Sequence, residues 1–280
     1  MTEQSRLTPP PASYDEAAEA AALQAAAKRS RRSFLITGAL GLAGLAGWRW
    51  LDSRPTVEGI PGPLRKVLDF NADLTNAYYK NTRLAPEFAR SRARKIRVNG
   101  KVGLSNGFDP QTWKLTVQAY APVGTSPQVH TFTIEQIKAL PRTEMTTEFK
   151  CIEGWSTIVH WAGVRLSDFL AKYPLATRSG QRIADPHNPP ADAAAYVGMT
   201  TPNDGYYVGL EMQSALHPQT LLCYEMNGQP LSLAHGAPLR LVSPLKYGVK
   251  HIKRIGTIAF TDVRPKDYWA ELGYDWHAGH

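Results

Sequence analysis

One cysteine stands where its chemistry could be used. Cys151 follows residues 143–150, in which polar and less polar side chains alternate with the period of a half-buried strand. Residues 152–162 then bring Trp155 and Trp161 close behind, and we expect them to form a loop that walls a pocket. A thiolate held rigidly at a strand end is suited to ligate a metal.

Two other roles for this cysteine stay open on the residues alone. Free cysteine is among the most often buried residue types and commonly only fills space. The chain has one other cysteine, Cys223, and in an exported protein the pair could form a disulfide. The choice between packing, cross-linking and ligation therefore depends on the rest of the chain.

A second stretch, residues 235–255, has the composition of an anion-binding loop. Gly236 and Gly248 permit tight backbone turns. Four basic side chains supply donors of the kind that bind phosphate: Arg240, Lys250, Lys253 and Arg254. A basic strand that faces water is the alternative, but it would not explain the spacing of glycine and proline.

The N-terminal part carries the pattern of an export signal. Arg31 and Arg32 precede Phe34 and Leu35 within a run of sixteen uncharged residues, 33–48. This arrangement is typical of a twin-arginine signal, a route that exports folded proteins and so suggests a cofactor. We expect a periplasmic protein, held at the inner membrane by an uncleaved signal.

The charge distribution argues against nucleic-acid binding. The formal net charge is +8, but residues 28–100 hold 15 Lys and Arg against 5 Asp and Glu, whereas residues 101–280 hold 16 against 15. A basic juxtamembrane segment explains this asymmetry, and no nucleic-acid recognition motif is present.

The elements that must position these residues are mostly strands. Period-two patterns predict strands at 96–100, 113–120, 129–133, 143–150, 196–199, 206–210 and 221–226, and helices at 133–137 and 166–173. Asn227-Gly228 predicts a hairpin turn. The fold class is therefore α+β, mixed and strand-dominated.

Together, the stretch Cys151-Ile152-Glu153-Gly154-Trp155-Ser156 and the loop 235–255 resemble the sulfite-oxidase-fold family of molybdopterin oxidoreductases. The resemblance covers roughly residues 70–265 and is greatest to the bacterial periplasmic branch that reduces protein methionine sulfoxide. It implies a sulfite-oxidase-type molybdopterin-binding fold without a C-terminal immunoglobulin-like domain.

The resemblance also assigns roles residue by residue. It implies that Cys151 ligates molybdenum. Glu153, two residues further on, could act as a second catalytic residue that relays protons to the departing oxygen, or could be a surface or hydrogen-bonded carboxylate. The implied contacts to the molybdopterin are Asn76, Tyr79, Cys151, Thr201, His235, Arg240, His251, Ile252 and Lys253. Lys80, His235 and His251 depart from the pattern of that branch.

Composition and the resemblance together divide the chain into five parts. These are a disordered or weakly helical extension (1–29), the twin-arginine signal or anchor (30–51), a linker (52–63), the molybdopterin-binding oxidoreductase domain (64–265) and an aromatic tail (266–280). The tail residues His277 and His280 could bind a metal, although packing or a loose tail is the alternative that we prefer.

The implied activity is oxygen-atom transfer with one molybdenum-molybdopterin per chain. Because Glu153 stands where sulfite oxidisers carry a cation, a neutral S-oxide or N-oxide is the expected substrate. No C-x-x-C-H haem motif occurs, so electrons are expected from a separate membrane b-type cytochrome, with the chain otherwise monomeric. A non-catalytic exported binding or structural protein, with Cys151 and Cys223 as a disulfide, is the alternative.

Overall fold

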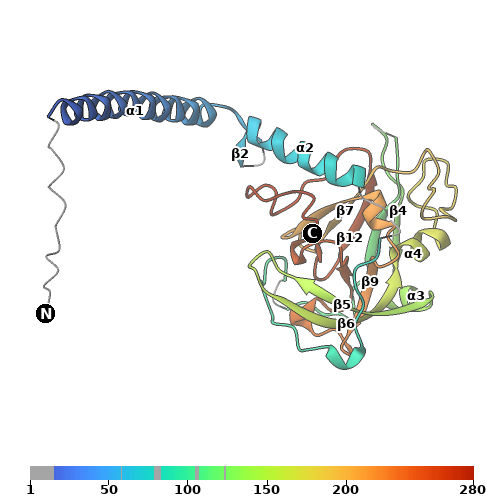
Figure 1. Ribbon diagram of the computed structural model, residues 1–280. Helices are drawn as coiled ribbons and strands as arrows, with labels where there is room; N and C mark the ends of the chain where they lie inside the picture. The colour runs from blue at the N-terminus through green and yellow to red at the C-terminus, as the bar shows by residue number, and fades with distance from the viewer. Residues whose placement is uncertain (1–15, 58, 79–82, 105–106, 123) are drawn as a thin grey trace, which may run out of the picture. The chain divides into compact units, whose positions relative to one another are not determined.

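The computed structural model describes residues 16–57, 59–78, 83–104, 107–122 and 124–280. The chain divides into two units, which we describe separately (Figure 1). The first unit comprises residues up to 55 together with 61–63, and the second comprises residues 56–60 and 64–280.

The first unit is dominated by one long helix, α1 (Glu16–Asp52). We predicted a disordered or weakly helical extension as far as residue 29, and its described part is helical from Glu16, since Ala and Glu are strong helix formers. By length and composition, its part Leu23–Asp52 could cross a membrane. A signal sequence near an N-terminus has the same length and apolar composition.

Two five-stranded sheets form the second unit. The first has the order β10-β9-β6-β5, with β11 also paired to β9. Its strands are β5 (Arg142–Lys150), β6 (Ser156–Arg165), β9 (Leu221–Met226), β10 (Gln229–Pro230) and β11 (Arg240–Val242). All of its pairs are antiparallel.

The second sheet has the order β4-β3-β12-β7-β8, in which only β12 and β3 run parallel. Its strands are β3 (Leu115–Gln118), β4 (Val129–Phe132), β7 (Tyr196–Thr200), β8 (Tyr207–Glu211) and β12 (Thr257–Thr261). The short pair β1 (Thr56–Val57) and β2 (Ile60–Pro61) stands apart from both sheets.

Helices in the second unit are short, apart from α2 (Gly62–Tyr78), whose first two residues belong to the first unit. The others are α3 (Ile134–Lys138), α4 (Leu166–Lys172), α5 (Met212–Ala215) and the 3₁₀ turns η1 (Arg90–Arg92), η2 (Leu233–His235) and η3 (Gly248–Lys250). Thr133 and Gln136 form a capping box on α3, which explains its start.

Apolar residues of the two sheets pack into one large core, with Leu115 and Ile258 from one sheet and Val164 and Leu222 from the other. A smaller apolar cluster lies at the end of β5 and includes Met145, Phe149, Cys151, Trp161 and Cys223. Cys151 therefore lies at the end of a strand whose inner face is fixed by packing.

Most of the predicted elements are confirmed, and so is the hairpin turn. Asn227 and Gly228 both have positive φ, 53° and 78°, and join β9 to β10. Two predictions were wrong. Residues 96–100 form no strand, and the expected loop 152–162 is only four residues long, because β6 already begins at Ser156.

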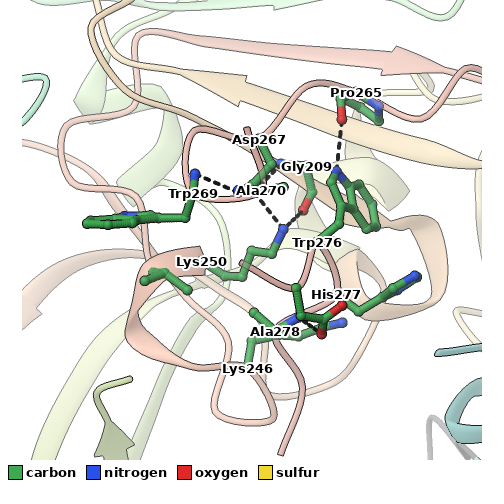
Figure 2. Close-up of polar contacts among 12 residues, drawn as sticks. Gly209, Lys246, Lys250, Pro265, Asp267, Trp269, Ala270, Trp276, His277 and Ala278 are labelled. Carbon is green, nitrogen blue, oxygen red and sulfur yellow. Dashed lines mark hydrogen bonds and ion pairs between the residues drawn. The ribbon is translucent and has the colours of Figure 1, made fainter. Parts of the chain in front are cut away.

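The aromatic C-terminal residues pack onto the domain (Figure 2). Trp276 is buried, donates to Pro265 O at 2.9 Å and lies so close to Gly209 that a Cβ there would approach its ring to 2.5 Å. Beneath it, the buried Lys250 ammonium bonds Asp267 at 2.6 Å and Gly209 O at 2.9 Å. Of the two tail histidines, His277 contacts the Glu211 carboxylate.

Candidate active site

A cavity of about 330 Å³ opens beside the end of β5. Segments far apart in the sequence form its walls: residues 96–102, the turn after β5, η2 with the start of β11, residues 248–253, and the C-terminal residues Trp269 and Tyr274. Six of the ten predicted site residues line it: Cys151, Glu153, His235, Arg240, His251 and Lys253.

Cys151 is held by a tight turn. Its backbone N–H donates to Trp155 O at 2.9 Å, and Gly154 N–H donates back to Cys151 O at 3.1 Å. Gly154 has a φ of +84°, which glycine adopts without strain. The thiol is free and largely buried, and it accepts a hydrogen bond from Asn99 Nδ2 at 3.6 Å.

The second cysteine has a different role. Cys223 is also free and fully buried in β9, where its thiol donates to Glu225 O at 3.1 Å. Burial raises its pKa to about 12, so it stays protonated and unreactive. The disulfide alternative is therefore wrong, and Cys223 fills space in the small apolar cluster.

Arg240 is a buried cation that has no carboxylate beside it among the described residues. Its guanidinium donates to the carbonyl oxygens of His235 at 3.2 Å and His251 at 3.3 Å, and it lies 5.1 Å from the Trp161 ring. Its Nε has no hydrogen-bond partner among the described residues. Burial lowers its pKa to about 10, so the group remains protonated at neutral pH and suits an anion from outside the chain.

His251 presents a hydrogen-bond acceptor. Its Nε2 lies 2.9 Å from Ser243 O and 3.2 Å from Lys246 O, so this nitrogen carries the proton. Burial lowers the His251 pKa to about 3, which keeps the ring neutral. Its buried Nδ1 has no partner in the part of the chain that the structure describes. An N–H group of a bound molecule could satisfy it.

Lys253 completes the cationic side of the cavity. Its ammonium donates to Asn99 O at 2.6 Å and Gly100 O at 3.1 Å. Burial, and then the nearby Arg240 charge, lower its pKa to about 8. Lysine and arginine are the usual donors to phosphate, and these two lack a carboxylate that would compete for them.

The two glycines of this loop are required for different reasons. Gly236 has a φ of +96°, and a Cβ there would lie 2.7 Å from Lys253 Cβ. Gly248 has no positive φ, yet a Cβ there would lie 2.2 Å from Phe149 Cζ. The first glycine makes the turn, as predicted, while the second lets η3 pack against β5.

Glu153 is exposed at the cavity, and a basic residue, Arg97, lines the cavity with it. Its carboxylate accepts from Trp155 Nε1 at 2.9 Å, and this bond, with Asn99, holds its pKa below the usual range. Arg97 lines the same wall, 5.8 Å from the Trp155 ring. We expected Glu153 alone to make this wall repel anions, but the wall carries both signs of charge.

Aromatic side chains form much of the remaining wall: Phe149, Trp155, Tyr206, Trp269 and Tyr274. Trp161, which we expected to line the approach, is fully buried beneath Arg240 and does not reach the cavity. The cavity therefore combines a cationic floor with aromatic walls, as suits a ligand with a charged end and an apolar approach.

Of the other four predicted site residues, two are fully described, and neither of these two lines the cavity. Ile252 is fully buried in the main core. Thr201 is buried and bonds Asn203, although its neighbour Tyr206 lines the cavity. Asn76 falls within α2, but its side chain is not among those described, and Tyr79, like Lys80, lies outside the described residues.

Sequence reasoning missed Arg97 and Asn99. Both lie in residues 96–100, which we expected to form a strand, and Arg97 belongs to the basic surplus that we assigned to a juxtamembrane segment. Their only signal was a polar cluster that ends at Gly100, a glycine with positive φ. Within the described ranges, no group of three or more His, Cys, Asp or Glu side chains could hold a metal ion.

Residues 101–269 match the model of the oxidoreductase molybdopterin binding domain. The chain belongs to this family. It is therefore a molybdopterin-dependent oxidoreductase with the sulfite-oxidase-type molybdopterin-binding fold, which confirms the predicted fold class and the enzyme class. The matched range includes Cys151, Arg240 and Lys253 but not Arg97 or Asn99.

Two relatives and one solved structure are similar to this molybdopterin-dependent oxidoreductase. A protein of Azospira oryzae, provisionally named protein-methionine-sulfoxide reductase subunit YedZ1, is 31% identical over 89% of this chain and 88% of its own length. The protein-methionine-sulfoxide reductase catalytic subunit MsrP of Xanthomonas campestris is 37% identical over 49% of this chain and 42% of its own. The sulfane dehydrogenase SoxCD from Paracoccus pantotrophus is 18% identical with a TM-score of 0.45, over 56% of this chain and 40% of that one.

The cavity fits the cofactor that defines the family. Cys151 with its free thiol, Arg240 with its buried guanidinium and His251 with its neutral imidazole line the same cavity. Arg240 Nε and His251 Nδ1 are buried there without a partner among the described residues. A molybdopterin brings a phosphate, pterin N–H groups and a metal. The donors and acceptors of the cavity are complementary to these three parts.

Proposed function

We propose that this oxidoreductase is exported and reduces a neutral S-oxide or N-oxide, methionine sulfoxide foremost, by oxygen-atom transfer. The observation that carries the proposal is the free Cys151 thiol, which shares one cavity with the buried Arg240 guanidinium, whose Nε has no partner among the described residues. The names of the MsrP relatives support a sulfoxide as the substrate.

The residues of the cavity divide the work of holding the cofactor. Cys151 would supply the thiolate ligand to molybdenum, Arg240 and Lys253 would bind the phosphate, and the neutral His251 would lie beside the pterin. When bound, the molybdenum cofactor supplies the two-electron chemistry that converts a sulfoxide, two protons and two electrons into a sulfide and water. The protein supplies position and electrostatics.

The substrate enters between the aromatic walls. Trp155, Trp269 and Tyr274 offer apolar surface to a sulfoxide side chain. Glu153 accepts from Trp155 Nε1 and orients that indole. Because its lowered pKa keeps Glu153 ionised at neutral pH, it is a poor proton donor, and its contacts favour this positioning role over the proton relay that we first considered.

Location and electron supply follow from the N-terminal part. The Arg31-Arg32 signal and the apolar helix Leu23–Asp52 support twin-arginine export, with the helix retained as an anchor in the inner membrane. An anchored reductase without a haem motif would take its electrons from a membrane b-type cytochrome, as the family resemblance implies.

The test is steady-state turnover of the full chain, expressed in a host that makes the molybdenum cofactor. With a reduced artificial donor we expect turnover of methionine sulfoxide and of trimethylamine N-oxide, and negligible sulfite oxidation. Cys151→Ala should abolish turnover and molybdenum content, whereas Cys223→Ala, a matched buried thiol, should keep both. Sulfite as the best substrate, or full activity in Cys151→Ala, would contradict the proposal.

A further inference from the structure

Helix α2 exposes a stripe of large apolar side chains that the oxidoreductase reaction does not use. Leu64, Val67, Phe70 and Leu74 are 43%, 55%, 65% and 50% exposed. At 3.6 residues per turn these positions fall on one side of the helix, so they form a mostly apolar face, in which the exposed Asn71 also lies. We call these four residues the α2 stripe.

The opposite side of α2 is attached to the domain. Arg65 is buried, Leu68 is half-buried, and Asp69 pairs with Arg264 at 3.3 Å. Figure 1 shows α2 in cyan along the outside of the second unit. The helix is therefore fixed by one side and presents the α2 stripe outward.

The chain leading into α2 indicates what could cover this face. Nine residues, 53–61, lie between the apolar helix Leu23–Asp52 and Gly62, the first residue of α2. The Gly62 N–H group donates to Pro55 O at 2.9 Å, which brings Gly62 next to Pro55. This bond closes the β1–β2 turn, so only residues 53–55 separate the end of the apolar helix from the start of α2. Three residues span at most about 10 Å.

The end of the apolar helix has the side chains of a membrane interface. Trp48 and Trp50 are exposed, and the Arg54 guanidinium lies 4.5 Å from the Trp50 ring. Tryptophan and arginine concentrate at the level of the lipid headgroups. A helix that begins within about 10 Å of that level lies within reach of the same interface.

We propose that the α2 stripe lies in the headgroup region of a lipid bilayer and holds the domain against the membrane. The inference rests on the proposed anchoring of the chain by its N-terminal helix. A bilayer surface suits four large exposed apolar side chains on one side of a helix, since interfacial helices bury their apolar face about 5–10 Å deep without directional contacts.

Site-specific cross-linking tests this placement. The full chain is reconstituted in vesicles of phosphatidylethanolamine and phosphatidylglycerol with the photoreactive residue p-benzoylphenylalanine in place of Phe70 or Leu74. Leu233 provides the matched control, because it is 50% exposed, as Leu74 is, but lies in η2. After irradiation, mass spectrometry identifies the adducts.

We expect lipid adducts at positions 70 and 74 at a level several-fold above position 233. Adducts to a second copy of the chain, or no adducts in a chain that floats with the vesicles, would overturn the α2 proposal while leaving the anchor intact. A chain that neither floats nor forms adducts would overturn both. Sulfoxide turnover, measured on the same vesicles, reports separately on the proposed function.

Discussion

The side-chain amide of Asn99 donates a hydrogen bond to Cys151 Sγ at 3.6 Å, and the backbone oxygen of the same residue accepts from Lys253 Nζ at 2.6 Å. Asn99 thus connects the Cys151 thiol with the cationic loop, although it belongs neither to residues 151–156 nor to the loop 235–255. A hydrogen bond to a ligand atom fixes its orientation and reduces its charge density.

We expect Asn99→Ala to lower sulfoxide turnover by roughly 10-fold, since partners of metal ligands commonly contribute 10- to 100-fold to affinity or activity. Molybdenum content and kcat measure the effect. Asn99→Asp is the control, because it keeps the size and the backbone contact to Lys253 but removes the donor. Wild-type turnover in both variants would show that the bond has no role.

Replacing Arg240 should move stability and cofactor content in opposite directions. Arg240→Met removes a buried charge that has no carboxylate partner, so the apo protein should keep its free energy of unfolding or gain up to about 2 kcal/mol. Molybdenum content should fall, since a charge-assisted phosphate contact is lost. Denaturant unfolding of apo protein and metal analysis give the two values, and full molybdenum content would contradict the assignment.

Lys253 should give the apo protein a characteristic pH dependence. Its folded-state pKa is about 8, below the ordinary 10.5, so the folded state releases this proton before the unfolded state does. Its contribution therefore makes the apo protein more stable as the pH rises from about 8 to 10.5, whereas phosphate binding weakens above pH 8. Lys253→Gln should remove both trends in pH-resolved unfolding and cofactor-binding measurements.

Glu153 and Arg97 should act together on charged ligands. Glu153→Gln should leave turnover of neutral sulfoxides nearly unchanged, because the ionised carboxylate is not the proton donor, but should strengthen inhibition by anions. Arg97→Gln should weaken that inhibition. Inhibition constants for sulfate in the single and double variants measure the coupling. A large loss of turnover in Glu153→Gln would restore the proton-relay role.

The Lys250–Asp267 pair should be a major source of stability for the C-terminal residues. Both side chains are buried, and Lys250 Nζ lies 2.6 Å from the Asp267 carboxylate. Lys250→Met leaves this carboxylate without its cation and should lower the free energy of unfolding by about 3–5 kcal/mol. Lys250→Met with Asp267→Asn should cost less, since no charge stays buried. Denaturant unfolding compares the two, and equal losses would show that the charge of Asp267 is unimportant.

The strands and the two motifs could be predicted because their signals are local. Alternation identified β5, and the glycine and arginine spacing identified the loop around Arg240. Asn99 could not be predicted in this way, because its partner Cys151 is 52 residues away and no pattern in residues 96–100 refers to it. The family resemblance did not identify it either, since none of the motifs that carry the resemblance contains residue 99.

Trp161 was predicted to line the cavity but does not. Its position soon after Cys151 suggested a pocket wall, but β6 starts at Ser156, and the alternation of that strand turns the indole inward under Arg240. Tyr274 was missed because a residue in an aromatic tail has no periodic signal. Contacts such as the packing of Trp276 against Gly209 show that this tail belongs to the domain.

The cavity walls come from residues as far apart as Ile96 and Tyr274. Contacts between such distant segments form late in folding, because closing long loops costs entropy before any contact compensates for it. The cofactor therefore meets its complete set of partners only in the native chain. It should slow unfolding and raise the melting temperature while leaving the folding rate unchanged.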